Sequence, residues 1–120
     1  MQTHPYFLPI TARPLSSRES LLLFELLSYV PKLYAEHVSS LTVIGRCGCG
    51  SCPTVFFNEP NSTESHIVSC SGKDELGNAV GVALLAIEST LTQLEFWSLD
   101  GQEPWTYPTP KSLVQIQDHV

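Results

Sequence analysis

The chain has 120 residues, 42% of them hydrophobic, and a formal net charge of −6. This length suffices for one domain with its own core, and no apolar run reaches the roughly 20 residues that cross a bilayer. The N-terminus lacks the basic and apolar segments of a secretory leader, so we expect a cytoplasmic protein. Thiols stay reduced in that compartment, so the four cysteines are expected to be free thiols or metal ligands.

The charge is unevenly distributed. Residues 1–58 have a net charge of +1, whereas residues 59–120 have a net charge of −7. An acidic half repels phosphates, so we expect no nucleic-acid partner, but the same field attracts a basic protein surface. Acidity also keeps proteins soluble, so the charge alone does not require a partner.

Residues 1–15 are predicted to form an extended N-terminal segment, because three prolines interrupt them. Helices are predicted over residues 16–39. Ser16 and Glu19 fit a capping box, which predicts a helix over residues 17–29. Pro31 suits the first turn of a helix, which predicts a second helix over residues 31–39.

Residues 40–99 have the alternation and the turn-forming residues typical of short consecutive strands. The strands are predicted near residues 41–45, 54–57, 66–70, 79–88 and 91–99, and residues 100–120 form an irregular, proline-rich tail. The predicted fold is a single α+β domain over residues 1–120. Two N-terminal helices pack on one face of a four- or five-stranded antiparallel meander sheet.

Three cysteines lie within six residues, at Cys47, Cys49 and Cys52. A structural zinc site usually has four Cys or His ligands, so a fourth ligand would come from Cys70 or His66. The ligand set is incomplete. The alternative is a tight turn in which Gly48 and Gly50 adopt positive φ and the cysteines pack as small apolar side chains. We therefore predict no metal and no cofactor, with the four-cysteine site as the alternative.

An enzyme is not predicted. Arg46 could lower the pKa of a neighbouring thiol, and His37 or His66 could act as a base. No cysteine lies at a predicted helix N-terminus, and the glycines of the 45–50 segment do not form a phosphate-binding loop. We therefore assign no catalytic residue.

The run Val43–Gly50, followed by Cys52–Val55 and by the later strand segment Leu94–Ser98, resembles a family of small uncharacterised bacterial α+β proteins with an "RCGCG…PTV" hairpin. In this chain Ser51 separates Gly50 from Cys52, where the resemblance leads us to expect the cysteine directly. The resemblance implies the α+β fold and no biochemical activity. In size and acidity the chain is also similar in kind to bacterial toxin-immunity proteins.

The predicted function is a non-enzymatic inhibitor of the immunity type, which neutralises a basic toxin or nuclease by occluding it. Carboxylates steer a basic partner, and aromatic side chains beside them provide desolvated contact area. The predicted partner-binding residues are Asp74, Glu75, Glu95, Trp97, Asp100, Glu103 and Trp105. The alternative is a metal- or thiol-dependent small module organised by the Cys47–Cys52 hairpin. No membrane partner is expected.

Overall fold

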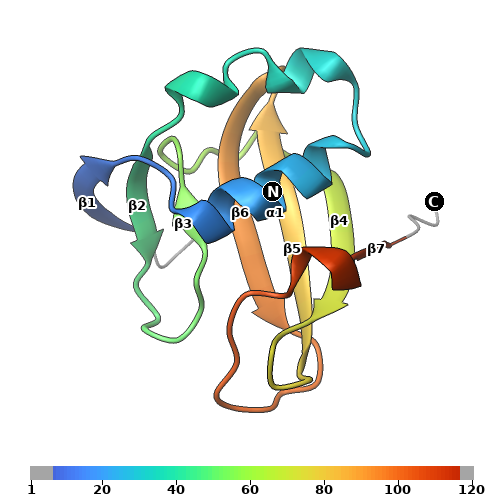
Figure 1. The fold of residues 1–120 in the computed structure, drawn as a ribbon. Coiled ribbons are helices and arrows are strands. Elements are labelled where there is room, and N and C mark those ends of the chain that lie inside the picture. Colours follow the sequence, from blue (N-terminus) through green and yellow to red (C-terminus); the bar gives the residue numbers. More distant parts are fainter. Residues whose placement is uncertain (1–6, 117–120) are drawn as a thin grey trace.

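The computed structural model describes residues 7–116, which form one curved antiparallel sheet with α1 lying across one face (Figure 1). Its strands are β1 (Phe7–Arg13), β2 (Val43–Cys47), β3 (Val55–Phe56), β4 (Ser65–Lys73), β5 (Ala79–Ile87), β6 (Thr90–Ser98) and β7 (Val114–Gln115). Its helices are α1 (Ser17–Leu27) and the short 3-10 helices η1 (Lys32–Ala35), η2 (Val38–Ser40) and η3 (Pro110–Ser112). The predicted α+β class is confirmed.

Helix α1 begins as predicted, with both halves of the capping box formed. The Ser16 hydroxyl accepts a hydrogen bond from the Glu19 amide at 3.1 Å, and the Ser16 amide donates to the Glu19 carboxylate at 2.8 Å. Arg13 binds the same carboxylate with two 2.9 Å hydrogen bonds. Burial raises the pKa of Glu19, but these donors outweigh burial and leave the pKa below its ordinary value.

The second predicted helix, residues 31–39, is realised as the two short 3-10 helices η1 and η2. Pro31 donates no backbone hydrogen bond, and the segment is short, which favours the tighter 3-10 turns. Tyr34 and Val38 still pack partly against the core. No helix within residues 7–116 is long and apolar enough to span a membrane.

The sheet has seven strands, so the predicted number of four or five is wrong. The extra strands include β1, which pairs with β2, and β7, which pairs with β4. Both lie at the edges of the sheet. Proline has no N–H to donate to a neighbouring strand, but an edge strand has a neighbour on one side only and tolerates it, as Pro9 in β1 shows.

The strand order is β1-β2-β3-β6-β5-β4-β7, which departs from a simple meander at two places, where β3 pairs with β6 and where β4 pairs with β7. Sequential strands pair within β1–β3 and within β4–β6, but β3 pairs with β6, with Val55 opposite Leu94. The segment between β3 and β4 is tied to β6. Buried Glu64 accepts hydrogen bonds from the Thr92 hydroxyl at 2.6 Å and from the side-chain amide of Gln93 at 3.1 Å.

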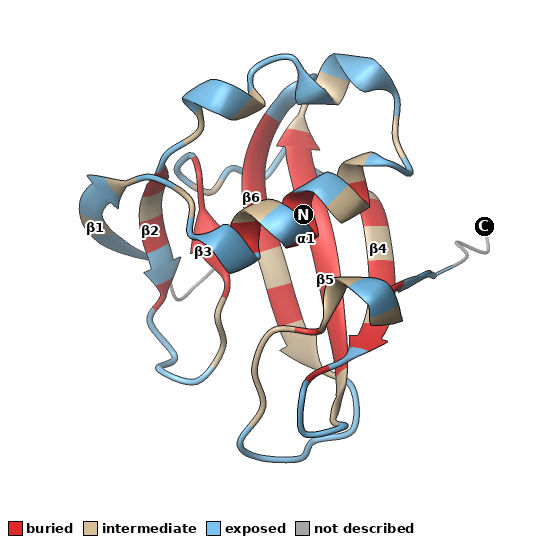
Figure 2. Ribbon diagram, in the orientation of Figure 1, coloured by how far each residue is buried: buried red, intermediate tan, exposed pale blue. Residues whose placement is uncertain are grey.

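The main hydrophobic core lies between α1 and the sheet, and the central strand β5 is buried along nearly its whole length (Figure 2). Leu94 and Phe96 of β6 belong to this core. Trp97 alternates to the other face, where its indole covers Gly81 of β5 and is half-buried. The buried central strands therefore contribute most of the apolar core of the sheet.

Candidate metal and thiol site

The cysteine cluster lies in the turn that joins β2 to β3. Cys47 is the last residue of β2, and its amide donates to the Thr54 carbonyl at 3.2 Å, which closes the hairpin. Gly50 has a φ of +84°, and a Cβ at this position would meet no atom within 4 Å. Glycine is therefore required at residue 50 by the backbone conformation, and the turn has open space around it. Gly48, which we also expected to adopt positive φ, does not.

The turn brings three sulfur atoms together. The Sγ atoms of Cys47, Cys49 and Cys52 all lie within 4.8 Å of one another, and those of Cys49 and Cys52 are 3.4 Å apart. Their exposure is graded, because Cys47 is buried, Cys52 is intermediate and Cys49 is exposed. Among residues 7–116 no other group of three His, Cys, Asp or Glu side chains is arranged to hold a metal ion.

Backbone amides of the turn point at Cys49. The Cys52 amide donates to Cys49 Sγ at 3.4 Å, and the Ser51 amide and the Cys47 thiol donate to the same sulfur. Desolvation is the largest single influence and raises the pKa of Cys49, but the donors together outweigh it and lower the pKa to about 6. Cys49 is therefore largely a thiolate at neutral pH.

The pKa of Cys47 is shifted in the opposite direction to that of Cys49. Its burial, together with the thiol hydrogen bond that it donates to Cys49, raises the pKa of Cys47 to about 12. Arg46, which the sequence offered as an activating cation, alternates to the exposed side of β2, whereas Cys47 is buried. The turn's own amides, rather than Arg46, are thus the main donors that stabilise negative charge on the cluster.

Thr54 anchors the cluster to the central sheet. The residue is 1% exposed, and its hydroxyl accepts a hydrogen bond from the Phe96 amide of β6 at 2.9 Å. The Cys52 thiol lies 3.5 Å from the same hydroxyl. The sequence showed no signal for this role, because the pairing of β3 with β6 decides which strand Thr54 faces.

Cys70, the fourth cysteine of the alternative ligand set, is not among the three cysteines whose sulfur atoms lie together. It lies in β4, fully buried in the core opposite Val82, whereas the three-cysteine turn follows β2. In the sheet order β3, β6 and β5 separate those two strands. Burial, and secondarily the charge of Glu25, raises the pKa of Cys70. Its role is that of a small core side chain.

The two histidines considered from the sequence also lie outside the cluster. His66 is on β4, and its Nε2 lies 3.0 Å from the Glu95 carboxylate. His37 immediately precedes η2. Neither belongs to the group of sulfur atoms. The site in the described part of the chain is therefore a set of three thiols with no fourth protein ligand.

The predicted partner-binding residues are divided between two places. Asp74 and Glu75 lie in the β4–β5 turn, and Asp100, Glu103 and Trp105 follow β6. These two segments meet at one end of the sheet, where the Ala79 amide donates to the Asp100 carboxylate at 2.9 Å. Glu95 and Trp97 lie within β6 itself.

Two of these carboxylates, those of Asp74 and Asp100, stabilise the fold by accepting backbone hydrogen bonds. Asp74 is only 4% exposed and accepts hydrogen bonds from the amides of Leu76, Asn78 and Thr106. Desolvation is the largest single influence and raises the pKa of Asp74, but these donors together outweigh it and lower the pKa. At Asp100, the amides of Ala79 and Gln102 likewise lower the pKa of the carboxyl group.

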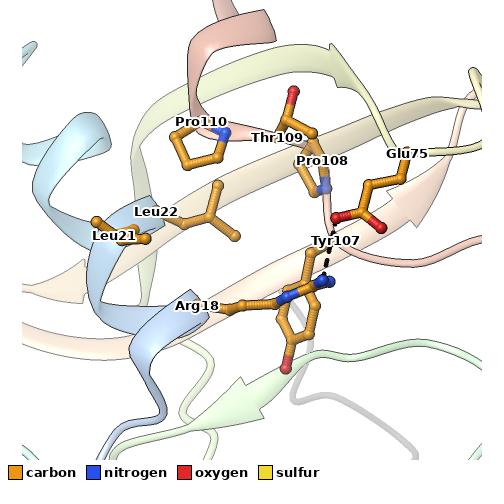
Figure 3. A pocket seen from close by; sticks show the side chains of 8 residues that line it. All are labelled: Arg18, Leu21, Leu22, Glu75, Tyr107, Pro108, Thr109 and Pro110. Atoms are coloured by element: carbon orange, nitrogen blue, oxygen red, sulfur yellow. Dashed lines mark hydrogen bonds and ion pairs between the residues drawn. The ribbon is translucent and has the colours of Figure 1, made fainter.

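Glu75 contributes to a shallow pocket of about 200 Å³ between α1 and the C-terminal segment (Figure 3). Its carboxylate pairs with Arg18 of α1 at 3.1 Å, and the Arg18 guanidinium lies 5.9 Å from the centre of the Tyr107 ring. The remaining walls are Leu21, Leu22 and the Pro108–Pro110 segment. The pocket offers no unpaired charge, because its two charged side chains neutralise each other.

Comparison of the chain with protein-family models, with curated proteins and with solved structures gives no match. The resemblance to bacterial proteins with an "RCGCG…PTV" hairpin therefore stays a prediction.

Proposed function

We propose that this protein is a small non-enzymatic module that binds one thiophilic metal ion through the thiolates of Cys47, Cys49 and Cys52. The observation that supports the proposal is the mutual approach of the three sulfur atoms, all within 4.8 Å. A metal–sulfur bond of about 2.3 Å in tetrahedral geometry places two ligand sulfurs about 3.8 Å apart. The turn thus needs only small side-chain adjustments to hold one ion.

The chemistry of the ligands selects the class of metal. Sulfur ligands alone favour soft ions such as Cu(I) and the borderline ion Zn(II) over Mg(II) or Ca(II). Three protein ligands suit three-coordinate Cu(I), or Zn(II) with an outside molecule in its fourth position. Binding must displace the proton of Cys47, whose pKa is raised to about 12, so affinity increases with pH and protons are released.

The test is titration of the reduced protein with Cu(I) and with Zn(II) in the presence of a competing chelator. We expect one equivalent of one of these metals to bind, and affinity to fall on the order of 100-fold in Cys47→Ala, Cys49→Ala and Cys52→Ala. Cys70→Ala is the matched control and should bind like the native chain. Absence of a stoichiometric site, or an equal loss in Cys70→Ala, contradicts the proposal.

A second candidate function is the inhibition of a basic protein, and one observation favours it. The exposed carboxylates Glu75, Asp100 and Glu103 share their end of the sheet with two exposed leucines, Leu76 at 68% and Leu99 at 45%. Apolar side chains ringed by acids suit a basic partner, with steering by the carboxylates and contact by the leucines. This acidic end, residues 74–78 and 98–105, is the proposed binding surface.

Charge reversal tests the second candidate. Asp100 holds the Ala79 and Gln102 amides, so the informative variant is Glu75→Lys/Glu103→Lys, which spares those contacts. Glu36→Lys/Glu59→Lys makes the same change of charge at exposed residues outside this end. A basic protein that the native chain and the control retain, and that the first variant loses, supports inhibition. Equal retention by both variants contradicts it.

A further inference from the structure

We propose that Cys49 and Cys52 also form a reversible disulfide by exchange with low-molecular-weight disulfides, with Cys49 as the attacking thiol. This activity goes beyond metal binding and needs no metal. Its basis is the separation of 3.4 Å between the Cys49 and Cys52 sulfur atoms, together with the exposure of Cys49.

The different exposure of the three cysteines determines which thiol reacts first with a small disulfide. An incoming disulfide reaches Cys49, which is exposed, before Cys52, which is intermediate, and it does not reach Cys47, whose side chain is 3% exposed. Cys49 therefore forms the mixed disulfide, and Cys52, whose sulfur atom lies 3.4 Å from that of Cys49 and is more accessible than that of Cys47, resolves it.

The turn permits the closure. A disulfide bond is about 2.05 Å long, so the two sulfurs must approach by somewhat more than 1 Å. Gly50 and Ser51, the residues between the two cysteines, are exposed, and a side chain at Gly50 would meet no neighbour within 4 Å. The turn can thus tighten without displacing the core, while Thr54 holds its base on β6.

Two exchange steps balance the reaction. The Cys49 thiolate attacks one sulfur of the small disulfide, whose S–S bond breaks, and one small thiolate leaves with the electron pair. The Cys52 thiolate then attacks Cys49 Sγ, and the second small thiolate leaves. The small disulfide gains two electrons and takes up the two protons lost by the protein thiols, which become the Cys49–Cys52 disulfide.

Such a bond would be easily reversed. It closes a loop of only two intervening residues, which restricts the unfolded chain little and adds little stability. Exposed disulfides of this kind are reduced more readily than structural ones. The buried thiols Cys47 and Cys70 should stay reduced throughout.

The experiment incubates the metal-free, reduced full-length chain with mixtures of reduced and oxidised glutathione, followed by an acid quench, alkylation and peptide mass spectrometry. We expect two thiols to be lost as a Cys49–Cys52 cross-link. Cys70→Ala should give the same cross-link, whereas Cys52→Ala should stop at a glutathione adduct on Cys49. In Cys49→Ala the rate of adduct formation should fall on the order of tenfold or more.

Three results would overturn the proposal: four alkylated thiols even in fully oxidised glutathione, a main cross-link to Cys47 or Cys70, or no adduct on Cys49 in Cys52→Ala. Circular dichroism of each variant shows whether it is folded. Because the chain is metal-free in this experiment, failure of metal binding leaves these outcomes unchanged, so the two proposals fail separately.

Discussion

The cysteine turn and the acidic end of the sheet are both built from tight connections between antiparallel strands, yet their reactive groups are used differently. At the acidic end, Asp74 and Asp100 are largely occupied by backbone amides that they hold in place. In the cysteine turn, the amides of Ser51 and Cys52 point at a sulfur instead, and no strand depends on that thiolate. A group whose donors belong to its own turn remains available for outside ligands, whereas a group that bridges two segments is part of the scaffold.

The largest expected effect concerns thiol reactivity. At pH 7 iodoacetamide should modify Cys49 on the order of 100-fold or more faster than Cys47, because only Cys49 is both exposed and ionised. The rate at Cys49 should rise with pH to a midpoint near the pKa of about 6. Mass spectrometry of the quenched reaction measures both the ratio of the two modification rates and the pH midpoint at Cys49. A midpoint near that of a free thiol, about 8.5, would show that the turn amides do not stabilise the thiolate.

The next effect tests the anchor of the cysteine turn. Thr54→Val removes the hydroxyl that accepts from the buried Phe96 amide, so the free energy of unfolding should fall by about 1–3 kcal/mol. Urea unfolding measures the change, and Thr54→Ser, which keeps the hydroxyl, is the control. If valine is tolerated as well as serine, the turn is not held to β6 through this contact.

At the acidic end, Asp74→Asn should lower the melting temperature by several degrees at pH 7, because amides of both segments lose a charged acceptor. The pKa of Asp74 is lowered on folding, so its stabilisation is present above the unfolded value of about 4 and is lost as pH falls through the folded value. The difference between native and variant should therefore shrink in acid. A difference that is independent of pH would indicate a steric effect of the amide.

The smallest effect is expected at Glu103, which is exposed and lies in the segment after β6 at the same end of the sheet. Glu103→Lys should change the free energy of unfolding by no more than about 0.5 kcal/mol, as at most surface positions. Thermal melts of this variant beside Asp74→Asn separate acids that hold the turn from acids that only face solvent. A loss as large as that of Asp74→Asn would erase this distinction.

Local signals in the sequence predicted much of the scaffold. The capping box of Ser16 and Glu19 located the start of α1, and alternation located β4, β5 and β6 to within a few residues at each end. The Cys47–Cys52 turn between two strands was also predicted. These features depend on hydrogen bonds and side-chain periods within one segment, which is why a single sequence contains them.

Tertiary structure alone decided the rest. The edge strands β1 and β7 exist because β2 and β4 offer them unpaired backbone groups, and the pairing of β3 with β6 follows from burial shared by distant segments. The same long-range packing assigned Cys70 to the core and left Cys47, Cys49 and Cys52 as the cluster. Residue type shows that a thiol or a carboxylate can bind or react, but only its neighbours in space determine whether that group is already occupied.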